Sequence, residues 1–278
     1  MTDFEVPEAF ICSPFEEPAA HWHLQEGVDP EKREGRRPAI YFYPAPSTDE
    51  PGTSPSAGTA IELKLVNLIR ARVKQWRSDG YPGVTATTLE LLQYWRRDGR
   101  SFRFFFAQLE AVETIIFLNE ARHDYLQGID VPRDEPSDKQ KEELGYKAFR
   151  RYACKMATGS GKTTVMGMVS AWSILNKVHD RSNARYSDVV LVVCPNVTIR
   201  SRLGELDPRR SEGSLYRKSD LVPPHLMPDL PELVAARSRI LTRLSLFGGK
   251  QDPSANAVHQ RWGRAHSMGL LYPHGSGC

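Results

Sequence analysis

Apolar residues recur at helical spacing in three stretches of the first half of the chain. The pattern predicts amphipathic helices over residues 61–76, 87–95 and about 106–121. The first helix presents an apolar face formed by Leu65, Ile69, Val73 and Trp76. The Asp-Gly-Tyr-Pro-Gly sequence at 79–83 ends it, and Thr-Thr-Leu-Glu at 87–90 is a capping box that opens the second helix. This part of the chain is therefore predicted to be helical.

The pattern changes in the second half. Residues 188–194 form a continuous apolar, β-branched run, which is typical of a strand buried on both faces of a parallel sheet. A second strand is predicted to lead into a glycine-rich turn near residue 160, and a helix with Val165, Val169, Trp172 and Met166 facing inward follows that turn. Strand, turn, helix and strand form a βαβ unit, so we predict an α/β fold with a right-handed crossover.

The turn itself, Met-Ala-Thr-Gly-Ser-Gly-Lys-Thr at 156–163, has the composition of a phosphate-binding loop. Small residues let the backbone N–H groups converge on phosphate oxygens, and the following helix directs its positive end at the same anion. Lys162 can reach the β- and γ-phosphates, and the Thr163 hydroxyl is placed to complete a Mg²⁺ shell. The predicted contacts to ATP come from Thr158, Gly159, Ser160, Gly161, Lys162, Thr163 and Thr164. The alternative is a glycine-rich turn that only joins a strand to a helix.

One position departs from the usual pattern, because Met156 stands where the first glycine is expected. Residues 156–163 nevertheless resemble motif I of superfamily 2 helicases, and the restriction-enzyme motor subunits of that superfamily tolerate another residue there. Residues 193–200 resemble its motif Ia, and residues 104–117 resemble the stretch that carries an adenine-reading glutamine. The chain is thus similar to the DEAD/DEAH-type family of type III restriction enzyme Res subunits, from about residue 61 to about residue 230.

The resemblance implies a partial RecA-like domain and an ATP-driven motor that acts on DNA as part of a restriction system. It implies that Gln108 contacts adenine and that Asn196, Thr198 and Arg200 contact the DNA backbone. It also implies a modification methyltransferase as a possible further partner.

Hydrolysis needs a second acidic motif, usually Asp-Glu after another apolar strand, to hold Mg²⁺ and position water. No such pair follows residue 194, so the catalytic residues stay unassigned. We therefore expect an N-terminal portion of a motor that binds ATP weakly and does not hydrolyse it alone.

Two other functions fit the loop. A small-molecule kinase would share the loop and the helix, although it should also show an acceptor-binding carboxylate and an arginine-bearing lid. A non-catalytic module could retain the loop without turnover.

Four segments are predicted along the chain. Residues 1–60 end in a Pro/Ser-rich linker, 61–146 form a helical accessory region, 147–230 begin the ATP-binding domain, and 231–278 are an unassigned tail that we expect to be truncated or aberrant. The net charge of +3 is too small to indicate nucleic acid by itself; only the arginines at 96–103 and 200–202 cluster.

The cysteines bear on metal binding and on the compartment of the protein. Cys12, Cys154, Cys194 and Cys278 show no zinc-ligand spacing, and Cys154 and Cys194 fall on predicted buried strands. With no signal peptide and no apolar run long enough for a bilayer, these features indicate a reducing cytoplasm.

Overall fold

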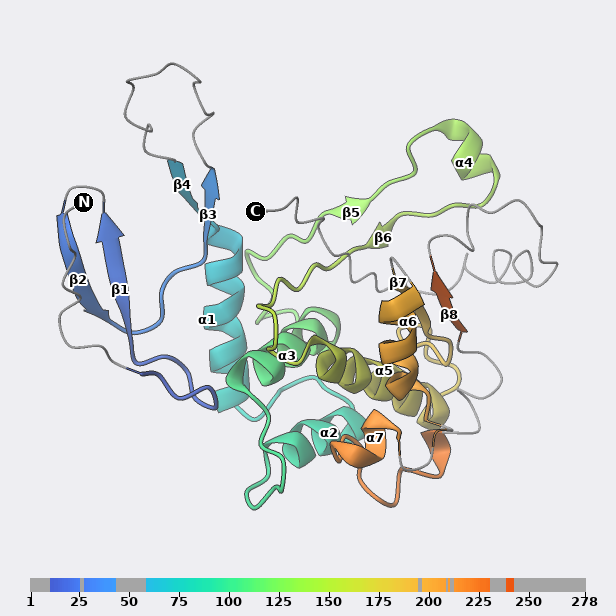
Figure 1. Cartoon of the computed structure of the whole chain (residues 1–278). Coiled ribbons are helices and arrows are strands. Elements are labelled where there is room, and N and C mark those ends of the chain that lie inside the picture. Colours follow the sequence, from blue (N-terminus) through green and yellow to red (C-terminus); the bar gives the residue numbers. More distant parts are fainter. Residues whose placement is uncertain are drawn as a thin grey trace.

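The computed structural model describes residues 11–25, 28–43, 59–194, 197–208, 210, 213–230 and 239–242. These parts of the chain combine helices with short strands (Figure 1). The helices are α1 (Lys64–Ser78), α2 (Ala86–Arg96), α3 (Phe106–Glu120), α4 (Lys139–Glu143), α5 (Lys162–His179), α6 (Val197–Leu203) and α7 (Leu215–Lys218), with a 3₁₀ turn at Gly204–Leu206. The strands are β1 (Ala20–Gln25), β2 (Val28–Glu34), β3 (Ile40–Tyr43), β4 (Thr59–Glu62), β5 (Arg133–Asp134), β6 (Phe149–Arg150), β7 (Leu191–Cys194) and β8 (Arg239–Thr242).

The core lies among the helices. α3 is apolar around most of its circumference, and it packs against α1 on one side and α5 on another, while α2 packs against α5 (Figure 1). The largest buried side chains include Trp76, Trp95, Trp172, Tyr216 and Phe117. Trp76 meets the ring of Phe117 edge-on with the centroids 5.4 Å apart, a favoured geometry for aromatic pairs. Helix packing therefore holds this part of the fold together.

The predicted helices are found with adjusted ends. α1 and α3 confirm the first and third predictions, although Leu65 on the predicted apolar face is 39% exposed. The capping box at 87–90 is wrong, because α2 begins at Ala86. Thr85 is its N-cap and accepts a hydrogen bond from the Thr88 N–H at 3.1 Å. Thr88 is instead a buried residue inside the helix.

The sheets are small. β1–β2, β3–β4 and β5–β6 are antiparallel two-stranded ribbons, and β7 pairs in parallel with β8 over four residues. β3 falls in the short apolar run at residues 39–43. The described residues contain no larger parallel sheet. The mixed composition of helix and strand is compatible with the α/β class, but the RecA-like sheet stays a prediction.

The strand predicted directly before the glycine-rich turn is wrong. Residues 151–157 form neither helix nor strand, because β6 ends at Arg150 and β7 pairs with β8 rather than with this segment. The alternation of the segment is nevertheless preserved, with Tyr152, Cys154 and Met156 packed against the core. Burial of β7 on both faces is also wrong, since Val193 is 48% exposed while Val192 and Cys194 are buried.

Residues 130–143 are rich in charge and proline but contain regular structure. β5 and β6 pair with each other, and α4 lies in the connection between them (Figure 1). α4 is capped by the Asp138 carboxylate, which accepts from the Lys141 N–H at 2.9 Å. On the other side of the molecule, an ion pair between Arg36 and Glu110 fastens the N-terminal ribbons to α3. No helix among the described residues has the length and apolar content needed to cross a bilayer.

Candidate functional site

The glycine-rich turn has the backbone of a tight loop opening into a helix. Gly159 and Gly161 both have left-handed backbones, with φ of +78° and +80°. Side chains other than glycine rarely adopt such values at low cost. Gly161 is the N-cap of α5, and the N–H groups of Thr164 and Val165 bond to its carbonyl. The first N–H groups of α5 therefore point out of the helix toward the loop.

Lys162, the first residue of α5, folds back over this loop. Its Nζ donates to the carbonyls of Met156 at 3.0 Å and Ala157 at 2.7 Å. The Ser160 hydroxyl donates to the same Ala157 carbonyl at 2.7 Å. The ammonium thus lies within the curve of the loop, held by neutral carbonyls that a phosphate group can replace with a stronger, charge-assisted partner.

Gln108 lies against the same loop, although it comes from α3. A Cβ atom added to Gly161 would stand 1.9 Å from Gln108 Nε2, so any larger residue there would require the Gln108 side chain or the loop to move. The other end of this amide is fixed, because Gln108 Oε1 accepts from the Phe105 N–H at 2.7 Å at the start of α3. The structure thus brings the predicted glutamine and the predicted loop together. Contact between Gln108 and a nucleotide stays a prediction.

A buried polar cluster holds α5 in place beneath the loop. Glu120 of α3 is 3% exposed and accepts hydrogen bonds from the Thr88 hydroxyl at 2.8 Å and from the Trp172 indole N–H. Asn176 Nδ2 donates to the Thr88 hydroxyl at 2.9 Å, and Asn176 Oδ1 accepts from the Thr85 hydroxyl. Because buried polar groups are costly unless paired, this cluster specifies how α2, α3 and α5 fit together.

The remaining predicted ligands surround the loop. Thr158 and Gly159 are exposed, while Ser160, Gly161, Lys162, Thr163 and Thr164 are half-buried. Thr163 lies in the first turn of α5 beside Lys162, the position from which a hydroxyl serves Mg²⁺ in a phosphate-binding loop. The left-handed glycines, the exposed loop and the single ammonium fit a triphosphate. Elsewhere in the described ranges, no three His, Cys, Asp or Glu side chains gather at metal-binding distance.

The residues predicted to contact DNA lie after β7. Thr198 is exposed in the first turn of α6, Arg200 lies in the same helix, and Asn196 lies outside the described residues. α6 follows β7 directly, as the predicted order of motifs requires. DNA contact at these residues stays a prediction.

The other arginine cluster, at residues 96–103, is largely internal. Arg96 Nε donates to the buried Glu113, and Arg97 pairs with Asp220 while its guanidinium stacks 3.6 Å from the centroid of the Tyr94 ring. Arg100 has a side chain that is only 2% exposed. Arg96 therefore joins α2 to α3, and Arg97 and Arg100 join the end of α2 to the segment after α7, while Arg103 is exposed.

We expect Arg100→Gln to lower the free energy of unfolding by about 2–3 kcal/mol. Arg100 donates to the carbonyls of Ser219 at 2.9 Å and Asp220 at 2.8 Å, and its guanidinium stacks on Phe104 at 4.2 Å. Urea unfolding followed by tryptophan fluorescence measures the loss. The exposed Arg103→Gln serves as the matched control and should leave stability nearly unchanged. Equal stability of both variants would show that Arg100 is not a structural residue.

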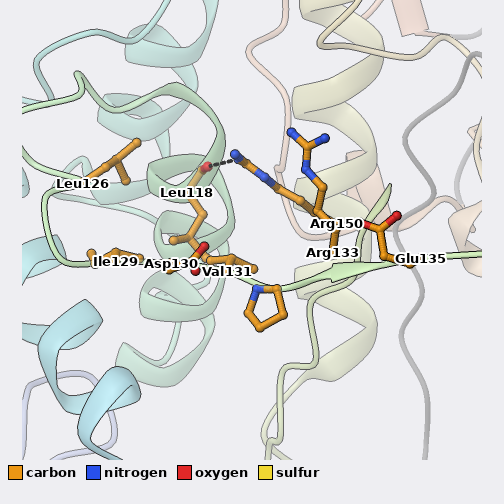
Figure 2. Close-up of a pocket in the computed structure, with 9 residues that line it drawn as sticks. Leu118, Leu126, Ile129, Asp130, Val131, Arg133, Glu135 and Arg150 are labelled. Carbon is orange, nitrogen blue, oxygen red and sulfur yellow. Dashed lines mark hydrogen bonds between the residues drawn. The ribbon is translucent and has the colours of Figure 1, made fainter. Parts of the chain in front are cut away.

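Sequence reasoning missed two features of this region. Glu113 and Glu120 are buried carboxylates on an apolar helix; their seven-residue spacing puts them on one face and is the signal that could have revealed them. A cavity of about 370 Å³ lies beside β5 and β6 (Figure 2), and none of its lining residues belongs to the glycine-rich loop. Burial raises the pKa of the Cys154 thiol, so this cysteine near the loop is not a ready nucleophile.

Comparison of the chain with protein-family models, with curated proteins and with solved structures gave no match.

Proposed function

We propose that this chain binds MgATP as part of an ATP-dependent DNA motor of the superfamily 2 type, the class to which restriction-enzyme motor subunits belong. One observation carries the proposal: two left-handed glycines open onto the N-terminus of a long helix, and Lys162 folds over the loop between them. Backbone N–H groups, a helix dipole and an ammonium then converge on one place, which is the chemistry that a triphosphate requires.

Each residue has a role in this proposal. Lys162 exchanges its contacts to the Met156 and Ala157 carbonyls for the β- and γ-phosphates, while the backbone from Gly159 to Thr163 surrounds their oxygens. Thr163 contributes its hydroxyl to Mg²⁺. The position of Gln108 against Gly161 supports a role for its amide at the nucleotide, with adenine as the proposed contact.

The remaining parts of the proposal rest on the sequence. Contact of Asn196, Thr198 and Arg200 with DNA, membership of a restriction system and association with a methyltransferase follow from the motif resemblance. The proposed location is the reducing cytoplasm. Because no Asp-Glu pair follows β7, we propose that the chain alone binds ATP without turning it over.

The decisive test is a titration with a fluorescent ATP analogue in the presence of Mg²⁺. We expect saturable binding that Lys162→Ala weakens about tenfold or more, because one charge-assisted contact to phosphate is lost. Lys155→Ala is the matched control: Lys155 is an exposed lysine just before the loop, and its removal should change the affinity little.

The two variants separate the possible functions. Equal affinities for Lys162→Ala and the unchanged protein would favour a non-catalytic module that retains only the shape of the loop. Phosphate release from ATP above the Lys162→Ala background would contradict the prediction that the chain alone does not hydrolyse it.

A further inference from the structure

A cavity of about 370 Å³ lies beside the β5–β6 ribbon and apart from the glycine-rich loop. Its volume is in the range of sites for small molecules. Leu118 comes from the end of α3, and the other lining residues come from the chain that follows and from the ribbon (Figure 2). They are Leu126, Ile129, Asp130, Val131, Pro132, Arg133, Glu135 and Arg150.

Two arginines of the ribbon lie side by side along this cavity. Arg133 and Arg150 are directly opposite in the antiparallel pairing of β5 with β6, and both line the cavity. Like charges at directly opposite positions destabilise a ribbon. Figure 2 shows both side chains extending to the same side of it. Because both side chains are exposed, solvent screens this repulsion and its cost to the ribbon is small.

The structure offers these two guanidinium groups little compensation. Arg150 Nη1 donates to the Leu118 carbonyl at 3.3 Å, which is a neutral partner. Within the described ranges neither guanidinium forms an ion pair, whereas the next arginine, Arg151, is paired with Asp134. The ribbon thus pairs Arg151 with a carboxylate, while Arg133 and Arg150, both exposed at the edge of the cavity, can receive another anion.

The other lining residues restrict what that anion can be. Asp130 and Glu135 lie on opposite flanks of the arginines, where they repel a polyanion and can accept hydrogen bonds from hydroxyl or amino groups (Figure 2). Leu126, Ile129 and Val131 add an apolar wall. A phosphate monoester carries nearly two negative charges and matches two guanidinium groups, whereas a carboxylate carries only one.

We propose that this cavity binds a small organic phosphate, with the phosphate group between Arg133 and Arg150 and the hydroxyl groups of the ligand near Asp130 and Glu135. The site is separate from the proposed ATP site, since its residues lie on the β5–β6 ribbon and the segment after α3. A nucleic-acid phosphate is the other source of this chemistry, and the flanking carboxylates disfavour it.

The test is a titration of the full chain with inorganic phosphate and with ribose 5-phosphate, followed by the arginine Nε–Hε signals in NMR spectra. We expect saturable shifts of the Arg133 and Arg150 signals, with ribose 5-phosphate binding more tightly than inorganic phosphate. Arg133→Gln should weaken binding about tenfold, because one charged donor is removed. Arg33→Gln, an exposed arginine of the β1–β2 ribbon, is the matched control and should leave the binding unchanged.

A second measurement keeps the proposal testable through stability alone. Because the two arginines repel each other, Arg133→Gln should unfold at equal or higher urea concentration than the unchanged protein without phosphate. It should also lose the stabilisation that added phosphate gives the unchanged protein. Destabilisation by Arg133→Gln in the absence of phosphate would overturn the argument.

Four further outcomes are decisive. Binding that persists in Lys162→Ala supports the proposal, because that variant alters only the glycine-rich loop. Phosphate shifts that disappear in Lys162→Ala, or that survive in an Arg133→Gln/Arg150→Gln double variant, would overturn it. Displacement of ribose 5-phosphate by a short single-stranded oligonucleotide would assign the cavity to nucleic acid instead.

Discussion

Replacing Glu113 with alanine should lower the free energy of unfolding by about 3–5 kcal/mol, the usual cost of removing one partner from a buried ion pair. Glu113 is 1% exposed and lies in the middle of α3. Its Oε2 accepts from Arg77 Nε at 3.0 Å and Nη2 at 2.6 Å, and its Oε1 accepts from Arg96 and from the Tyr81 hydroxyl. One carboxylate therefore satisfies groups from three parts of the chain.

Loss of the Glu113 carboxylate should also affect the connection between α1 and α2. Tyr81 has a left-handed backbone, with φ of +63°, which is uncommon for an aromatic residue. Its hydroxyl is held by Glu113, and its ring meets Trp76 edge-on at 4.9 Å. Burial, followed by the nearby charge of Glu113, raises the pKa of Tyr81, so the phenol stays a neutral donor. Glu113→Ala leaves this donor and two guanidinium groups without their acceptor.

Chemical unfolding in urea measures the effect, and two variants serve as controls. Glu113→Gln keeps the shape of the side chain and one acceptor oxygen, so it should lower the free energy of unfolding less than Glu113→Ala does. Asp124→Asn disrupts an arginine–carboxylate pair on the surface, between Arg122 and Asp124, and should cause no measurable change. Equal losses for Glu113→Ala and Asp124→Asn would contradict the structure of this cluster.

Helical periodicity predicted α1 and α3 well because α1 buries one face, at Val73 and Trp76, and α3 buries most of its circumference. The residues that set the boundaries were harder to predict. Thr85 and Thr87 both suit the start of a helix, and the choice of Thr85 depends on tertiary contacts: Thr88 lies inside α2 because its hydroxyl meets Glu120 and Asn176. Local capping rules consider only neighbouring residues, so they cannot predict an effect of these long-range partners.

Strand pairing could not be predicted because it depends on residues far apart in the sequence. The alternation before the loop is real, since Tyr152, Cys154 and Met156 pack inward, but no strand of the described chain pairs with it. Likewise, Arg133 and Arg150 lie far apart in the sequence, and no local pattern relates them. Only the pairing of β5 with β6 places them opposite each other.

At the candidate site too, sequence patterns predicted the local structure but not the long-range contacts. The composition of residues 156–163 predicted a loop that opens a helix, and α5 does begin at Lys162. The proximity of Gln108 and Gly161 is different, because no local pattern relates two residues on different helices. The motif resemblance proposed both for one site, and the packing of α3 against α5 brings them together.

Gly161→Ala is expected to have the largest effect at the candidate site. The substitution forces a left-handed alanine, which costs about 1–2 kcal/mol, and places its methyl group 1.9 Å from Gln108 Nε2. Gln108 cannot move away freely, because its Oε1 caps the Phe105 N–H. Either Gln108 gives up this hydrogen bond or the loop shifts, so both stability and affinity for the fluorescent ATP analogue should fall.

Gly159→Ala is the matched control, because it has nearly the same φ and nothing within 4 Å of an added Cβ. Gly159→Ala should lower the free energy of unfolding only by the cost of a left-handed alanine. Its loss of stability should therefore be smaller than that of Gly161→Ala. A double-mutant cycle then isolates the collision: in a Gln108→Ala background, Gly161→Ala should cost no more than Gly159→Ala does. If Gly161→Ala costs the same in both backgrounds, the two residues do not touch, and the glutamine has no direct influence on the loop. Because the cycle reads stability, it tests this contact whether or not the loop binds ATP.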